Sequence, residues 1–219
     1  MGKEINLLRN YPSANRNLEI RRQGKTDEVR KIARKFDQEY FDGERIYGYG
    51  GFVYNKKYWT EVVKDFINEY KLGANSRVLD VGCAKGFMVF DFINALPELE
   101  IYGIDISNYA LKNSIEQVRE KLILGNAVNL PFPDKYFDLV ISINTIHNLQ
   151  RSDCLKALQE IQRVTKINAF ITVDAYRNIE EKKRMEDWNL TALTIMSDFE
   201  WKDFFLEAGY LGDYYWFIP

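Results

Sequence analysis

Residues 77–87 of the chain have the sequence RVLDVGCAKGF, and this stretch decides the fold. Val78, Leu79 and Val81 make a short apolar run of the kind that forms a buried strand in a parallel sheet. Gly82 and Gly86 then bracket a loop in which the backbone can approach a ligand closely. Residues 87–96 (FMVFDFINAL) follow with the apolar spacing of a helix that ends before Pro97. A strand, a glycine loop and a helix N-terminus together predict a nucleotide-type site that favours an anionic group.

Outward from this stretch, predicted strands and helices alternate, which is typical of a parallel sheet with helices on both faces. Further strands are predicted at 101–105, 122–124, 137–143, 169–173 and 210–218. Helices are predicted at 107–120, 151–164, 179–189 and 198–207. The sequence therefore predicts an α/β fold from residue 77 onward.

Before the core strand, residues 27–41 and 56–72 carry the apolar spacing of two amphipathic helices. Glycines alternate with aromatic residues between them, and two interpretations of this loop stay open. It is either a lid or substrate loop, in which Tyr47, Tyr49 and Tyr54 contact the acceptor, or a packed turn that positions the preceding helix.

Composition sets broad limits. The chain has 219 residues, 46% of them apolar, with a net charge of −2, which suits one domain with an elaboration and gives no global reason to expect a polyanionic partner. The basic residues between 9 and 35 are interpreted as a solvated helix face, with an anion-binding surface as the alternative. Cys83 and Cys154 are the only cysteines, so neither a disulfide framework nor a metal site is expected. The sequence shows neither a signal peptide nor an apolar run of about 20 residues. We therefore expect a cytoplasmic protein that does not bind a membrane.

Polar residues follow several predicted strands, and ligands of open parallel sheets bind beyond the carboxyl ends of the strands. The second strand ends at Asp105, whose carboxylate can accept hydrogen bonds from ribose hydroxyls. The third is followed by residues 126–127, which suit the edge of an adenine ring. The fourth leads into Asn144 and His147, and the fifth ends at Asp174.

Four segments in this order resemble the motif set of class I S-adenosylmethionine (SAM) dependent methyltransferases: VLDVGCAKG, GIDIS, GNAVNLPFPDKYFDLVISINTIHNL and ALQEIQRVTK. The stretch from Leu130 to Asp138 is similar to the small-molecule branch of that family. The resemblance implies a Rossmann-like, mostly parallel twisted sheet with helices on both faces in residues 73–219. It covers residues 1–72 poorly, and we expect these to form an N-terminal arm and helical lid.

The resemblance also implies which residues contact the cofactor. Asp80 would help hold the glycine loop and the amino group, Asp105 would bind the ribose hydroxyls, and Ile106 would pack on the adenine. The full implied set is Asp80, Gly82, Cys83, Ala84, Gly86, Asp105, Ile106, Asn126, Ala127 and Asn144. SAM would be the methyl donor and S-adenosylhomocysteine the product.

His147 is the only histidine and the first candidate for a catalytic base, because an imidazole that titrates near neutral pH can deprotonate a hydroxyl or amine. The alternative is a structural histidine at the start of a helix. Asp174, Tyr176 and Arg177 are rivals, and Arg177 could instead clamp a substrate carboxylate or phosphate. Placement of the acceptor can also suffice without a strong base.

The sequence therefore predicts a SAM-dependent methyltransferase that acts on the hydroxyl or amine of a metabolite or sugar. Three alternatives stay open: a SAM-binding enzyme of other chemistry, a nicotinamide dehydrogenase, and a non-catalytic SAM-binding module. We expect no nucleic-acid partner. The chain has room for only one strand after its last helix, where the family usually has two. The sheet edge is thus expected to be completed by residues 190–196, or covered by the N-terminal segment or by a partner, which leaves a homodimer open.

Overall fold

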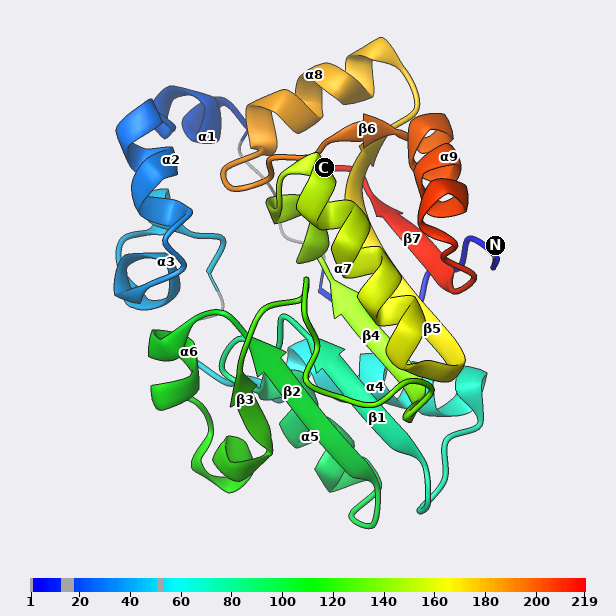
Figure 1. Cartoon of the computed structure of the whole chain (residues 1–219). Helices are drawn as coiled ribbons and strands as arrows, with labels where there is room; N and C mark the ends of the chain where they lie inside the picture. Colours follow the sequence, from blue (N-terminus) through cyan, green and yellow to red (C-terminus); the bar gives the residue numbers. More distant parts are fainter. Residues whose placement is uncertain (1, 13–17, 51–52) are drawn as a thin grey trace.

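The computed structural model describes residues 2–12, 18–50 and 53–219, and it is built around one sheet (Figure 1). The strand order is β3-β2-β1-β4-β5-β6, and β7 also pairs with β5. Every pairing between these described strands is parallel. The strands are β1 (Arg77–Val81), β2 (Glu100–Asp105), β3 (Leu122–Leu124), β4 (Phe137–Ile143), β5 (Thr165–Tyr176), β6 (Met196–Ser197) and β7 (Asp213–Phe217). The predicted α/β, Rossmann-like class with a mostly parallel sheet is confirmed.

Different helices cover the two faces of the sheet, because successive side chains of a strand point to opposite faces. The covering helices are α4 (Lys56–Tyr70) and α5 (Phe87–Ala95) on one face, and α7 (Arg151–Val164) and α9 (Asp198–Ala208) on the other. Val78 of β1 packs into the core with α4 and α5, whereas Leu79 and Val81 pack into the core with α7 and α9. Each of these three side chains is at most 1% exposed, and full burial of such a side chain stabilises the fold by roughly 1.5–3 kcal/mol.

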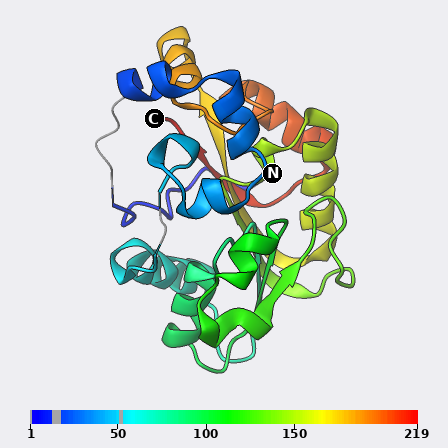
Figure 2. The same ribbon diagram turned by 90° about the vertical axis from the view of Figure 1, so that its left-hand side faces the viewer.

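Residues 18–50, which we name the lid, lie across the carboxyl ends of the strands. Figure 2 shows the lid helices between α8 above and α6 below. The lid contains α1 (Leu18–Gly24), α2 (Asp27–Ala33), α3 (Gln38–Asp42) and the 3-10 turn η1 (Arg45–Tyr47). It contacts α8 (Ile179–Trp188) through α1 and α6 (Asn108–Lys112) through α3. A small core of Val29, Ala33 and Leu190 attaches the lid to the segment after α8. None of the helices in the described residues combines the length and apolar character needed to span a bilayer.

The single helix predicted at 27–41 is wrong, because the lid chain breaks between α2 and α3. Phe36 has a φ angle of 49°, in the left-handed region, and Asp37 begins the next helix. The Phe36 ring packs against Tyr40 with centroids 5.1 Å apart, which holds the break in place. The break redirects α3 toward α6.

The helix predicted at 107–120 is also two elements, α6 and the 3-10 helix η2 (Glu116–Lys121). Between them the N–H of Ile115 donates to the carbonyl of Lys85 at 3.2 Å, so a contact with the glycine loop replaces a helical hydrogen bond. The predicted end of α4 at Gly73 is wrong by two residues, since Lys71 takes the left-handed capping conformation with a φ angle of 50°.

At the β5 end of the sheet, two of the arrangements expected for the edge occur together. Residues 190–196 lead into β6, and the short strand pairs Met196 with Ala175 of β5. The outer strand β7 is covered by the N-terminal segment. There the N–H of Ile5 donates to the carbonyl of Tyr214 at 2.9 Å, and the N–H of Tyr214 donates to the carbonyl of Lys3 at 3.1 Å. The edge of β7 is therefore paired by the chain itself.

Candidate active site

The loop after β1 folds back onto β2. The N–H groups of Gly82 and Cys83 both donate to the carbonyl of Ile104, at 2.8 and 3.2 Å. Gly82 has a φ angle of 88°, and a Cβ there would lie 2.1 Å from Oγ1 of Thr145. Gly86, with a φ angle of 76°, is the N-cap of α5 and provides no side-chain cap. The backbone N–H groups at the start of α5 are thus available to an anionic group.

A buried and a half-buried carboxyl group, those of Asp80 and Asp105, flank this loop. Asp105 accepts the N–H of Ala84 on Oδ2 and the N–H of Ser107 on Oδ1, both at 2.8 Å. Asp80 is 4% exposed, and no described residue hydrogen-bonds to its side chain. Burial, together with the negative charge of Asp105, raises the pKa of Asp80 to about 8. Burial also raises the pKa of Asp105, against the effect of the N–H groups it accepts. The structure therefore brings together the two acids that the sequence singled out.

The residues predicted to contact adenine lie after β2 and β3. Ile106 is 57% exposed, so its side chain is free to cover a ring. Asn126 uses its Oδ1 to accept the N–H of Val128 at 3.1 Å, and Ala127 is half-buried beside it. One lone pair of the Asn126 side-chain oxygen is therefore engaged, and its second lone pair and its amide N–H group are left for a ligand.

Asn144 ends β4 in a left-handed conformation with a φ angle of 51°. Its N–H donates to Oγ1 of Thr172 at 2.9 Å, and its Oδ1 accepts that hydroxyl at 3.0 Å. These bonds fix the turn that places Thr145 against the glycine loop. Asn144 is exposed at the site, as expected for a residue near the methionine end of a cofactor.

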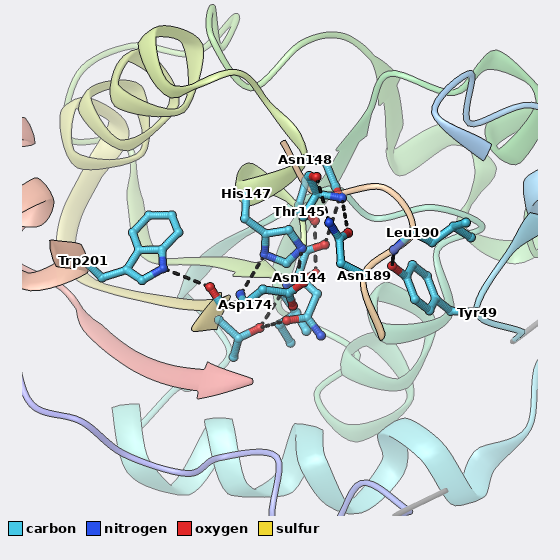
Figure 3. A network of polar contacts seen from close by, with 12 residues as sticks. Tyr49, Asn144, Thr145, His147, Asn148, Asp174, Asn189, Leu190 and Trp201 are labelled. Carbon is cyan, nitrogen blue, oxygen red and sulfur yellow. Dashed lines mark hydrogen bonds and ion pairs between the residues drawn. The ribbon is translucent and has the colours of Figure 1, made fainter. Parts of the chain in front are cut away.

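His147 and Asp174 form a buried pair at the ends of β4 and β5 (Figure 3). The Nδ1 atom of His147 accepts the backbone N–H of Asp174 at 3.0 Å, and Nε2 lies 3.7 Å from Oδ1 of the same residue. Trp201 donates from Nε1 to the carbonyl of Asp174 at 2.9 Å. Burial lowers the pKa of His147 and raises the pKa of Asp174. The ring is therefore a neutral imidazole whose Nδ1 lone pair is engaged.

The methyltransferase-domain family model matches residues 72–209, which include every strand tip described above. This chain belongs to the methyltransferase domain family. The methyltransferase is 34% identical over 151 residues to demethylmenaquinone methyltransferase of Geobacillus kaustophilus, which covers 66% of this chain and 61% of that protein. The predicted membership of the class I SAM-dependent methyltransferases is confirmed.

Two further similar proteins are named for other acceptors. A tRNA (carboxymethyluridine(34)-5-O)-methyltransferase of Arabidopsis thaliana is 31% identical over 111 residues, 50% of this chain and 26% of that protein. The structure of Haemonchus contortus phosphoethanolamine N-methyltransferase 2, in complex with phosphomonomethylethanolamine and S-adenosylhomocysteine, aligns with a TM-score of 0.59 at 19% identity. That alignment covers 81% of this chain and 44% of the other, and it supports the fold alone.

The three tyrosines predicted to contact a substrate lie in different places in this methyltransferase. Tyr49 reaches the network around Asp174 (Figure 3), where its hydroxyl oxygen accepts the N–H of Leu190 at 2.8 Å. Tyr47 is half-buried in the small core of the lid. Tyr54 donates its hydroxyl to Oδ1 of Asp91 on α5 at 2.6 Å. Gly51 and Phe52 of the same loop lie outside the described residues.

Tyr40 of the lid is a residue that the sequence did not single out, and its ring contacts Phe36, Phe41 and Tyr49. Burial raises its pKa, with smaller contributions from Tyr49 and Asp105, and Asp174 acts in the same direction. Its hydroxyl thus lies within electrostatic range of acids on two strand tips, β2 and β5. Tyr40 follows the break at Phe36, and its ring lies 6.3 Å from that of Tyr49, centre to centre.

Arg177 lies at the edge of the methyltransferase site. Its Nη2 pairs with Oε1 of Glu4 at 2.9 Å, its side chain is 50% exposed, and its N–H donates to Glu181. Two surface hollows at the amino ends of the strands, both lined by Lys166 and Asn168, contain none of the predicted site residues.

Proposed function

We propose that this chain binds SAM at the carboxyl ends of β1 and β2 and transfers its methyl group to a small molecule held under the lid. The observation that carries the proposal is the buried Asp80 carboxyl, which receives no hydrogen bond from the described residues. A nearly buried carboxyl that accepts no protein hydrogen bond is poorly solvated, and a cationic group of a ligand would stabilise its charged form. The α-amino group of the cofactor is a cation that would supply that partner.

The residues around the loop fit the other parts of the cofactor. Each oxygen of Asp105 accepts one backbone N–H and keeps a lone pair for a ribose hydroxyl. The exposed side chain of Ile106 would pack on adenine, and Asn126 would offer its amide N–H group to the ring. The glycine loop lets the backbone approach the ribose and methionine portions closely.

Bound SAM supplies an electrophilic methyl group on its sulfonium. The protein's part is then to hold the acceptor in line and to accept its proton. Asp174 is the first candidate for this base, because a carboxyl with a raised pKa binds a proton more strongly than an ordinary one. His147 would act by holding the tip of β5, since its Nδ1 already accepts the Asp174 N–H. A base role for His147 stays a prediction, as does a substrate clamp at Arg177.

The acceptor that we propose is a small hydroxyl- or amine-bearing metabolite or sugar. The relatives are named for acceptors as different as demethylmenaquinone and tRNA, so their names do not choose between acceptor classes. The position of the lid favours a small molecule. Tyr49 bonds to Leu190, and Arg34 donates to the carbonyl of Thr191 at 3.2 Å, so the lid is attached to the segment after α8. A polymer would need an open groove at this place.

Calorimetric titration with S-adenosylhomocysteine tests the cofactor part of the proposal. We expect Asp105→Asn to weaken binding roughly 10- to 100-fold, because a hydrogen bond to a charged group contributes about 1.5–3 kcal/mol. Asp134→Asn is the matched control, since Asp134 is an exposed acid in the loop before β4, at the amino ends of the strands. No heat of binding to the native chain, or equal affinity in the Asp105 variant, would contradict the proposal.

A further inference from the structure

Two arginines of the lid converge on one carbonyl oxygen. Arg21 of α1 donates from Nη2 to the carbonyl of Gly48 at 2.8 Å and from Nη1 to that of Ile46 at 3.3 Å. Arg45 of η1 donates from Nη1 to the same Gly48 oxygen at 3.0 Å. We name Arg21 and Arg45 the arginine pair. Like charges held this close repel each other, so an anion between them would be stabilised.

No carboxylate among the described residues pairs with either guanidinium. Arg21 is half-buried, and burial lowers its pKa, as does the charge of Arg45. Its neighbour on α1 behaves in the ordinary way, because Arg22 is exposed and pairs with Glu19 at 2.8 Å. A partly desolvated cation whose hydrogen-bond acceptors are neutral carbonyls still lacks a compensating negative charge.

The arginine pair lies beside the aromatic side of the lid. The guanidinium carbon of Arg21 lies 5.2 Å from the centre of the Tyr49 ring and 5.4 Å from that of Trp188. These two rings are themselves 5.3 Å apart. A flat guanidinium packed against two rings keeps a fixed orientation. The Arg21 side chain therefore has a fixed orientation before any ligand binds.

The arginine pair lies within electrostatic range of Tyr40 and Tyr49 of the lid. The charge of Arg21 lowers the pKa of Tyr40, whereas the charges of Asp105 and Asp174 raise it. Asp174 likewise raises the pKa of Tyr49. The lid is thus positive at the arginine pair, whereas the strand tips are acidic. Such a separation would orient an acceptor that carries an anionic group at one end and its nucleophile at the other.

We propose that the arginine pair binds an anionic group of the acceptor, a phosphate ester or a carboxylate, attached to a ring or other flat body that packs on Tyr49 and Trp188. This inference rests on the proposed function, because it names the class of acceptor for the same site. It also gives the basic residues between 9 and 35 a specific role, since Arg21 turns inward while Arg22 stays in solvent.

The test uses phenyl phosphate and benzoate as probes, with benzyl alcohol as the neutral control at equal ionic strength. Binding is followed by the melting temperature and by ring shifts in NMR spectra of the full chain, with S-adenosylhomocysteine present. We expect saturable binding of at least one anion, and none of benzyl alcohol at the same concentration. Comparing the two anions decides whether the site takes phosphate or carboxylate.

The variants Arg21→Gln and Arg45→Gln should each weaken anion binding roughly tenfold or more, whereas Arg22→Gln should leave it unchanged. Arg45 is exposed, so its variant keeps the test valid if loss of Arg21 loosens the lid. Equal binding of benzyl alcohol, unchanged affinity in both arginine variants, or no anion binding would overturn the inference. Titration of each variant with S-adenosylhomocysteine keeps the two proposals apart, because the cofactor site contains neither arginine.

Discussion

Asp42 of the lid and Lys85 of the glycine loop form a two-pronged ion pair, with the two carboxylate oxygens 2.5 and 2.7 Å from Nζ. Tyr109, at the start of α6, donates its hydroxyl to the same carboxylate at 2.8 Å. The Lys85 side chain is 7% exposed and that of Asp42 29%, so the pair is largely removed from solvent. The lid is thereby attached to both loops between which the cofactor is proposed to bind.

Asp42→Asn should loosen the lid without unfolding the sheet. Loss of a half-buried ion pair costs more stability than loss of an exposed pair and less than loss of a buried one. We therefore expect the free energy of local opening to fall by about 1–3 kcal/mol. Hydrogen exchange of the backbone amides of α2 and α3 is the measurement. Asp37→Asn is the control, because Asp37 begins α3 without making a side-chain cap bond. Equal exchange in the two variants would show that the pair does not hold the lid.

The affinity for S-adenosylhomocysteine should depend on pH through Asp80. Its pKa is about 8 in the ligand-free chain, and a bound amino group would lower it, so binding releases a proton below pH 8. Affinity should therefore rise as pH increases toward about 8 and then level off. Titrations in buffers of different ionisation enthalpy measure the proton release. In the Asp80→Asn variant, fewer protons should be released when S-adenosylhomocysteine binds. An unchanged proton release in that variant would contradict the role of Asp80 as the source.

His147 offers a direct test of its own protonation state, because it is the only histidine of the chain. We expect its nitrogen NMR signals at pH 7 to show an unprotonated Nδ1 and a protonated Nε2. Burial lowers its folded-state pKa below 6.5, so the folded form binds fewer protons than the unfolded one. The free energy of unfolding should accordingly decrease as pH falls below about 6.5, and His147→Gln should reduce that dependence. Signals of a doubly protonated ring at pH 7 would argue against this arrangement.

Gly82→Ala should destabilise the protein and abolish cofactor binding. The new Cβ would lie 2.1 Å from Oγ1 of Thr145, on a backbone with a φ angle of 88°. Overpacking of this kind costs about 1–3 kcal/mol, which thermal unfolding can measure. Gly73→Ala is the control, since nothing lies within 4 Å of a Cβ there and its φ angle is not in the left-handed region. A Gly82 variant as stable as the Gly73 variant would mean that the loop adjusts freely.

The parts of the fold that the sequence predicted well are those with local signals. The apolar run before Gly82 and the acid at Asp105 lie within a few residues of the structure they specify. Ser197 begins α9, where its side chain and that of Glu200 form a reciprocal cap within four residues.

The parts that the sequence missed depend on distant partners. Asp42 meets Lys85 across 43 positions and Tyr109 across 67, so no local pattern could indicate the pair. The role predicted for His147 came from the chemistry of imidazole, but its tautomer is set by the N–H of Asp174, 27 positions away. The helix break at Phe36 is accompanied by packing of its ring against Tyr40, and helical spacing in the sequence does not reveal this contact.

The chain is attached to the sheet domain both before and after the lid. Before it, the N–H of Ile5 donates a hydrogen bond to the carbonyl of Tyr214 on β7. After it, the hydroxyl of Tyr54 donates one to Asp91 of α5. A segment attached at both ends stays close to the strand tips even when its contacts there break. Its effective concentration at the site therefore stays high. Re-covering the site is then a unimolecular event that does not depend on protein concentration. Cutting the chain once inside residues 18–50 would free two loose ends, and capture of ligands should then slow even though every binding residue is still present.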